Sequence, residues 1–139
     1  MHIDGGCHCG NITYEAEVDP DMVSICHCSD CQMLTGTAYR VNVRVNKQDF
    51  KLRGGTPKTY IKTAESGALR AQLFCPECGT PVFTMAPEGA TSITIRLGCV
   101  TQRAQLTPVA QIWQRSSLPW LSDLAHIPGS PEQQAKPTL

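Results

Sequence analysis

The chain of 139 residues carries 12 Lys and Arg against 12 Asp and Glu, so its formal net charge is zero. This balance disfavours a nucleic-acid-binding surface, which depends on clustered positive charge. The length predicts one domain with a modest core. No stretch approaches the roughly 20 apolar residues of a membrane span, and the first residues lack the basic and apolar regions of an export signal. We therefore expect a cytoplasmic protein with no nucleic-acid or membrane partner.

Short segments of alternating polar and apolar residues run through most of the chain. In residues 39–46 the alternation places three valines on one face of a strand and Arg40, Asn42 and Arg44 on the other. This pattern predicts a half-buried strand. Gly, Pro or Asp residues separate most of the segments, as expected for turns. The predicted strands are residues 12–16, 22–26, 39–46, 69–74, 81–85, 92–97 and 109–114.

Helical periodicity is absent from every segment of ten residues. One helical turn is predicted after Ser29, where Ser29 and Asp30 can cap residues 31–34 before Gly36 ends the turn. Its backbone N–H groups would point toward neighbouring cysteines, lower their thiol pKa values and favour an anionic ligand. The alternative is a plain surface loop.

The C-terminal residues 126–139 are rich in Pro and polar side chains. They offer too little apolar surface to offset the entropy lost on ordering. We therefore predict a domain at residues 1–125 followed by a flexible tail at residues 126–139.

Eight cysteines are the most unusual feature of the composition, and seven of them fall in tight clusters. In a reducing compartment such clusters indicate metal ligands rather than disulfides. Cys75 and Cys78 form a C-x-x-C pair followed by Gly79, and this spacing allows both sulfurs to point at one ion. We interpret this pair as a zinc knuckle.

The remaining clustered cysteines suggest a second site. Cys7 and Cys9 are two residues apart, and residues i and i+2 of a strand point to the same face. Seven thiolates divide naturally into four and three. We predict a closed, structural zinc on the four-cysteine set Cys7, Cys9, Cys75 and Cys78. The cysteine triplet is Cys26, Cys28 and Cys31.

A zinc ion with three protein ligands keeps one position for water or substrate, which is the mark of a catalytic site. Spacing alone does not assign the two sets. His8, His27 or Cys99 could complete a second closed site and remove the open position. We expect His8 and His27 to point away from the metal, and Cys99 to be a small buried apolar residue within residues 94–100.

The motifs, their order and the landmarks between them resemble one family, the glutathione-dependent formaldehyde-activating (GFA) enzymes, whose domain is shared with centromere protein V. The resemblance spans most of the chain. The matching segments are Gly5-Gly6-Cys7-His8-Cys9-Gly10, Cys26-His27-Cys28-Ser29-Asp30-Cys31 with Thr35-Gly36, Phe74-Cys75-Pro76-Glu77-Cys78-Gly79-Thr80-Pro81, and the later pairs Ile112-Trp113 and Pro119-Trp120.

The resemblance implies an all-β, tent-like fold of stacked antiparallel sheets, clamped by zinc on the four-cysteine set. It also implies a second zinc, held by the cysteine triplet beside a glutathione site, and leaves open that this ion is labile. The implied activity is that of a carbon–sulfur lyase that forms or cleaves a thiol–aldehyde adduct such as S-hydroxymethylglutathione. A non-catalytic zinc scaffold or interaction module of the same fold is the alternative.

Glutathione would also need cations for its two carboxylates. Arg40, Arg44, Lys62 and Arg70 are the candidates, and we expect each of them to lie at a solvated strand edge or loop.

Overall fold

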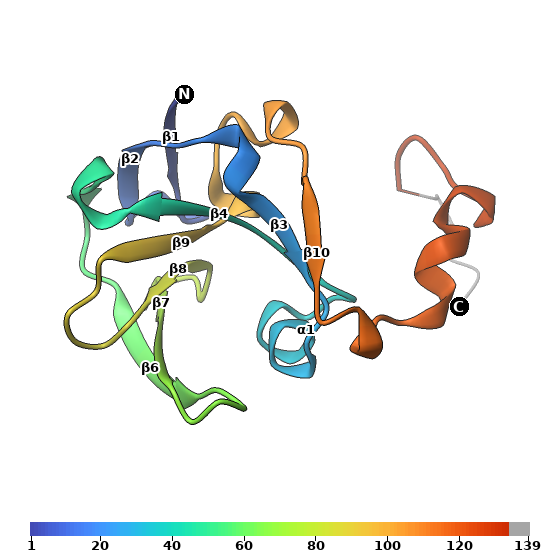
Figure 1. Cartoon of the computed structure of the whole chain (residues 1–139). Coiled ribbons are helices and arrows are strands. Elements are labelled where there is room, and N and C mark those ends of the chain that lie inside the picture. Colours follow the sequence, from blue (N-terminus) through green and yellow to red (C-terminus); the bar gives the residue numbers. More distant parts are fainter. Residues whose placement is uncertain (134–139) are drawn as a thin grey trace.

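The computed structural model describes residues 1–133, and strands make up most of the regular secondary structure (Figure 1), which confirms the all-β prediction. The strands are β1 (His2–Gly6), β2 (Thr13–Glu17), β3 (Val23–Cys26), β4 (Arg40–Asn46), β5 (Phe50–Gly54), β6 (Lys58–Thr63), β7 (Leu69–Phe74), β8 (Pro81–Met85), β9 (Ser92–Arg96) and β10 (Ala110–Ile112). The α-helix α1 (Ser29–Thr35) is one of the few helical elements, and the longest 3-10 helix is η6 (Pro119–His126).

The strands form two sheets. The smaller sheet has the order β1-β2-β5, and the larger has the order β10-β3-β4-β9-β8-β7-β6. Neighbouring strands of the described residues run antiparallel, as predicted, except that β10 lies parallel to β3 at one edge of the larger sheet. A bridge between Gly5 and Val100 joins the smaller sheet to the segment that follows β9.

The predicted strands agree with the structure where one face of the strand is apolar. The limits of β7 and β8 are those predicted, and the other five predicted strands occur with ends shifted by one or two residues. Strands β1, β5 and β6 were not predicted. Strands β5 and β6 are mostly exposed, and β1 ends in two glycines, so none of the three carries a continuous apolar face.

Helix α1 forms where the turn was predicted, but its N-cap differs. Cys28 takes the N-cap position, and its sulfur accepts a hydrogen bond from the backbone N–H of Cys31. Gly36 ends the helix at a φ of 68°, the left-handed conformation that glycine adopts without steric strain. The cysteine therefore takes the capping role predicted for Ser29 and Asp30.

The core lies between the two sheets. Tyr14 of β2 stacks on Phe50 at 5.4 Å, and Phe50 packs in turn against Phe83 of β8 at 4.9 Å. Val43 and Ile95 are completely buried beneath this aromatic row. The Tyr14 hydroxyl donates a hydrogen bond to the backbone oxygen of Cys99, so its polar atom is satisfied inside the core.

The opposite face of β4 corrects one sequence-based expectation. Arg40 is only 3% exposed and Asn42 only 7%, whereas Arg44 lies in solvent. The prediction that Arg40 lies at a solvated edge is therefore wrong. Strand β4 is a central strand of the larger sheet, and this part of its polar face is covered as well as its apolar one.

The described residues, 1–133, contain no helix long and apolar enough to cross a membrane. The predicted domain limit at residue 125 falls near the end of η6. Residues 134–139 of the predicted tail lie outside the described residues.

We predict that Gly5→Ala destabilises the fold by about 1–3 kcal/mol, because overpacking of a tight site carries a penalty of that size. A Cβ at Gly5 would collide with the backbone oxygen of Cys99 and the hydroxyl of Tyr14. Gly98→Ala is the matched control, since a Cβ there meets no atom within 4 Å. Urea unfolding of both variants measures the difference, and equal midpoints would contradict the prediction.

Candidate functional site

The four-cysteine set comes together from two turns that are far apart in sequence. Cys7 and Cys9 lie in the turn after β1, and Cys75 and Cys78 lie in the turn between β7 and β8. Their four sulfurs all lie within 4.8 Å of one another. The expectation that Cys7 and Cys9 lie on one strand is wrong, because a turn brings their sulfurs together instead.

The sulfur positions fit a tetrahedral zinc ion. Two measured separations are 3.6 Å between Cys7 and Cys9 and 3.7 Å between Cys9 and Cys75. Zinc–sulfur bonds of about 2.3 Å in a tetrahedron place neighbouring sulfurs about 3.8 Å apart. An all-sulfur donor set with this spacing could hold a zinc ion.

Backbone groups support this set from both turns. The N–H of Ile12 donates to the sulfur of Cys7 at 3.2 Å, and the N–H of His8 donates to the hydroxyl of Thr80 across the gap between the turns at 3.2 Å. Hydrogen bonds from Thr80 lower the pKa of Cys78 to about 5. The thiolate is the form that ligates a metal, so these contacts favour the binding-competent state.

The cysteine triplet lies where β3 passes into α1. Cys26 is the last residue of β3, Cys28 is the N-cap of α1 and Cys31 lies in its first turn. Their sulfurs also lie within 4.8 Å of one another. A hydrogen bond between Cys26 and Cys31 lowers the pKa of Cys26 and raises that of Cys31.

None of the three residues that could have supplied a fourth ligand to the triplet, His8, His27 and Cys99, joins its sulfurs. His27 is buried, its Nε2 is 2.8 Å from the side-chain oxygen of Gln111 and its ring packs near Tyr39. His8 is exposed, and Cys99 directs its thiol to the backbone oxygen of Pro81 at 3.0 Å. Among the described residues, the group of three therefore gains no fourth His, Cys, Asp or Glu ligand.

Cys99 is partly buried against the core, close to its predicted role as a small apolar residue. Burial raises the pKa of its thiol to about 11. At neutral pH the neutral thiol prevails, which makes Cys99 a poor nucleophile.

Two of the four candidate cations lie next to the triplet, and Arg40 is the more deeply buried of them. Arg40 is paired directly opposite Cys26 in the register of β3 and β4. Lys62 forms an ion pair with Asp30 of α1. Arg44 and Arg70 both line a separate cavity of about 270 Å³ that no cysteine lines.

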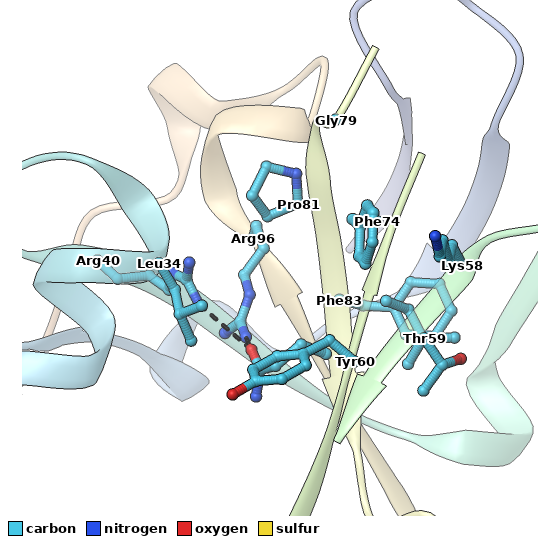
Figure 2. Close-up of a pocket in the computed structure, with 12 residues that line it drawn as sticks. Leu34, Arg40, Lys58, Thr59, Tyr60, Phe74, Gly79, Pro81, Phe83 and Arg96 are labelled. Atoms are coloured by element: carbon cyan, nitrogen blue, oxygen red, sulfur yellow. Dashed lines mark hydrogen bonds between the residues drawn. The ribbon is translucent and has the colours of Figure 1, made fainter. Parts of the chain in front are cut away.

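A cavity of about 430 Å³ opens beside Arg40 (Figure 2). Leu34 of α1, Tyr60 of β6 and Phe83 of β8 supply much of its apolar wall, and Arg96 joins Arg40 in it. The cysteines do not line this cavity. Arg40 connects the two features, because it lines the cavity and lies opposite Cys26 in the sheet.

Comparison with known proteins identifies the family. The sequence model of the family described as glutathione-dependent formaldehyde-activating enzyme matches residues 2–116. Because the match covers most of the chain, this protein belongs to the GFA family, as the motifs predicted. A comparison with curated individual proteins found no match.

The fold is also similar to a solved structure. A crystal structure of a Rhodobacter sphaeroides protein matches with a TM-score of 0.60 and 17% sequence identity. The match covers 78% of this chain and 98% of that one. At this identity the similarity concerns the fold alone.

Sequence reasoning did not find Arg96 or Gln72 as site residues. Arg96 is 8% exposed and hydrogen-bonds to Gln72, which also accepts from Arg40. A signal existed, because both residues occupy polar positions of strands that were predicted correctly. Which face those positions share depends on the pairing register, and that register is visible only in the structure.

We predict that Cys78→Ala prevents stable folding, whereas Cys28→Ala leaves the domain folded. A structural zinc contributes on the order of 10 kcal/mol, about as much as the whole stability of a small domain. Circular dichroism together with metal analysis measures both effects, and Cys99→Ala serves as the control with all seven clustered cysteines intact. Equal loss of folding in Cys28→Ala would make the triplet a structural site too.

Proposed function

We propose that this protein is a zinc-dependent carbon–sulfur lyase that forms or cleaves a small thiol–aldehyde adduct such as S-hydroxymethylglutathione. Membership of the GFA family supports the choice of glutathione and formaldehyde. The observation that carries the proposal is the cluster of three sulfurs, rather than four, at the junction of β3 and α1. Three ligands leave a coordination position for a substrate.

Zinc bound by the triplet would act as a Lewis acid and would favour the thiolate form of a substrate thiol. The protein residues hold that position in place. The sulfur of Cys28 accepts a hydrogen bond from the backbone of Cys31, which fixes the first turn of α1. The side-chain amide of Gln32 donates to the backbone oxygens of His27 and Ser116, so the turn is tied to the C-terminal segment.

The proposed reaction balances without a further reactant. In the forming direction the thiol sulfur bonds to the carbonyl carbon, the carbon–oxygen π bond opens, and the oxygen becomes a hydroxyl. The proton lost by the thiol equals the proton gained by the oxygen. Cleavage is the reverse, so no oxidant, reductant or nucleotide is required.

The four-cysteine set has a separate role in this proposal. It joins the turn after β1 to the turn between β7 and β8, and so fastens the smaller sheet to the larger one. With four ligands a zinc ion there has no open position. We therefore propose a structural zinc at this set and a reactive zinc at the triplet.

We predict that the zinc-loaded protein accelerates the exchange of formaldehyde between its free form and S-hydroxymethylglutathione. Exchange spectroscopy by NMR measures this rate at equilibrium, above the uncatalysed background. Cys28→Ala, if folded, should lose the acceleration because the metal position loses a ligand, and Cys99→Ala should retain it. A fully loaded wild-type protein that gives only the background rate would favour the non-catalytic scaffold instead.

A further inference from the structure

A row of polar side chains crosses the larger sheet on the face opposite the aromatic core. Cys26 of β3 lies opposite Arg40 of β4, and Asn42, two residues along the same strand, lies opposite Arg96 of β9. Directly paired residues share a face, as do residues two apart on one strand. Pairing therefore places both arginines on the face that carries the side chain of Cys26.

Side-chain amides hold the two arginines close together. Arg96 donates from Nη2 to the side-chain oxygen of Gln72 at 2.6 Å and from Nη1 to that of Asn42 at 2.6 Å. Arg40 donates from Nη1 to the same oxygen of Gln72 at 3.4 Å. The amide nitrogen of Gln72 is fixed by the hydroxyl of Thr84 at 3.1 Å, so its oxygen is directed at the guanidinium groups.

The two guanidinium groups interact with Cys26 and Cys31 of the triplet when these are ionised, but they have no carboxylate of their own among the described residues. Within this described part of the chain, Nε and Nη2 of Arg40 and Nε of Arg96 are buried without a hydrogen-bond partner. Burial, followed by the charge of Arg40, lowers the pKa of Arg96 to about 9. Two adjacent buried cations with unpaired N–H groups are unfavourable, and an anion that accepts hydrogen bonds from both would relieve this.

The cavities at this pair match an anionic occupant. Figure 2 shows Arg40 and Arg96 reaching toward one another beside the ring of Tyr60 in the cavity of about 430 Å³. A second cavity, of about 800 Å³, is lined by the same two arginines and by Arg103. Lys58 adds a further cation to the smaller cavity, and among the described residues no Asp or Glu lines either one.

We propose that Arg40 and Arg96, oriented by Gln72, bind a carboxylate of the thiol substrate. This inference rests on the proposed function, which places the sulfur of the same substrate at the cysteine triplet. The position of Arg40 opposite Cys26 puts the carboxylate and the sulfur of one small molecule within reach of adjacent groups. The preferred substrate class is a small thiol that carries a carboxylate, and neutral thiols are poor substrates.

The charges are consistent with this assignment. Three thiolates with one Zn²⁺ carry a formal charge of about −1, since coordinated thiols are deprotonated. The two arginines together carry about +2 at neutral pH. Lys58 and Arg103 in the walls of the two cavities add further positive charge. The net charge of this region therefore stays positive even when a substrate thiolate binds the zinc, which favours a carboxylate on the same substrate.

Three probes separate the carboxylate from the thiol in calorimetric titrations of the zinc-loaded protein. Glutathione has both groups, glutathione diethyl ester retains only the thiol, and S-methylglutathione retains only the carboxylates. The wild type should bind glutathione roughly ten- to a hundredfold more tightly than the diester, the range expected for hydrogen bonds to a charged group. Arg96→Gln should abolish this preference while its affinity for the diester stays unchanged.

Two further variants keep the test decisive if Arg96→Gln fails to fold. Gln72→Glu places a carboxylate of nearly the same shape between the arginines, so it should raise the melting temperature and lower the affinity for glutathione. If the arginines had a purely structural role, Gln72→Glu would raise the melting temperature but leave the affinity for glutathione unchanged. Arg44→Gln, on the exposed part of β4, is the matched control and should leave both quantities unchanged.

The outcomes distinguish this inference from the proposed function. Equal binding of glutathione and its diester overturns the carboxylate site and leaves the thiol site standing. Binding of S-methylglutathione that is lost in Arg96→Gln, with no binding of the diester, supports the carboxylate site and overturns the thiol site. Failure of all three probes overturns both.

Discussion

The pairing register of β3, β4 and β9 is the constraint on which the rest of this protein depends. A shift of one residue would exchange the two faces of β4, placing Val43 beside Arg96 and moving Asn42, together with Arg40, into the aromatic core. The valine face secures the register, because Val43 and Ile95 are paired and completely buried. The apolar core therefore also determines where Arg40 lies relative to Cys26.

The predictability of the fold from sequence depended on how each strand is buried. Strand β8 was predicted to the residue although its adjacent Val82 and Phe83 are both buried. Strand β7 was also predicted to the residue, and there the buried Ala71 and Leu73 alternate with more open positions. Strands at the sheet edges, such as β5 and β6, carry no such pattern, because their exposed sides accept any residue. The burial of Arg40 was not predicted, because the groups that cover the polar face of β4 come from other strands. The alternation within β4 itself gives no information about those groups.

The candidate site was likewise predictable from sequence only in part. Cysteine spacing identified the short groups Cys7 with Cys9, Cys75 with Cys78, and the triplet, because neighbouring ligands can reach one ion. Which of these groups lie together is visible only in the structure, where the first two form the four-cysteine set. Gln72 and Arg96 occupy polar positions of correctly predicted strands, but no short spacing in the sequence brings them together. Their contact joins β7 to β9, two strands separated in the sheet by β8, so it depends on two successive registers.

The parallel strand at the sheet edge affects the order in which the protein assembles. Strand β10 pairs with β3, and Gln32 bonds to Ser116, which lies 84 residues further along the chain. A ribosome therefore releases the triplet long before it releases the segment that supports it. Contacts of such high contact order form slowly. During synthesis the three thiols of the triplet are therefore exposed until β10 has been made. Early binding of a metal ion would protect them from oxidation at this stage.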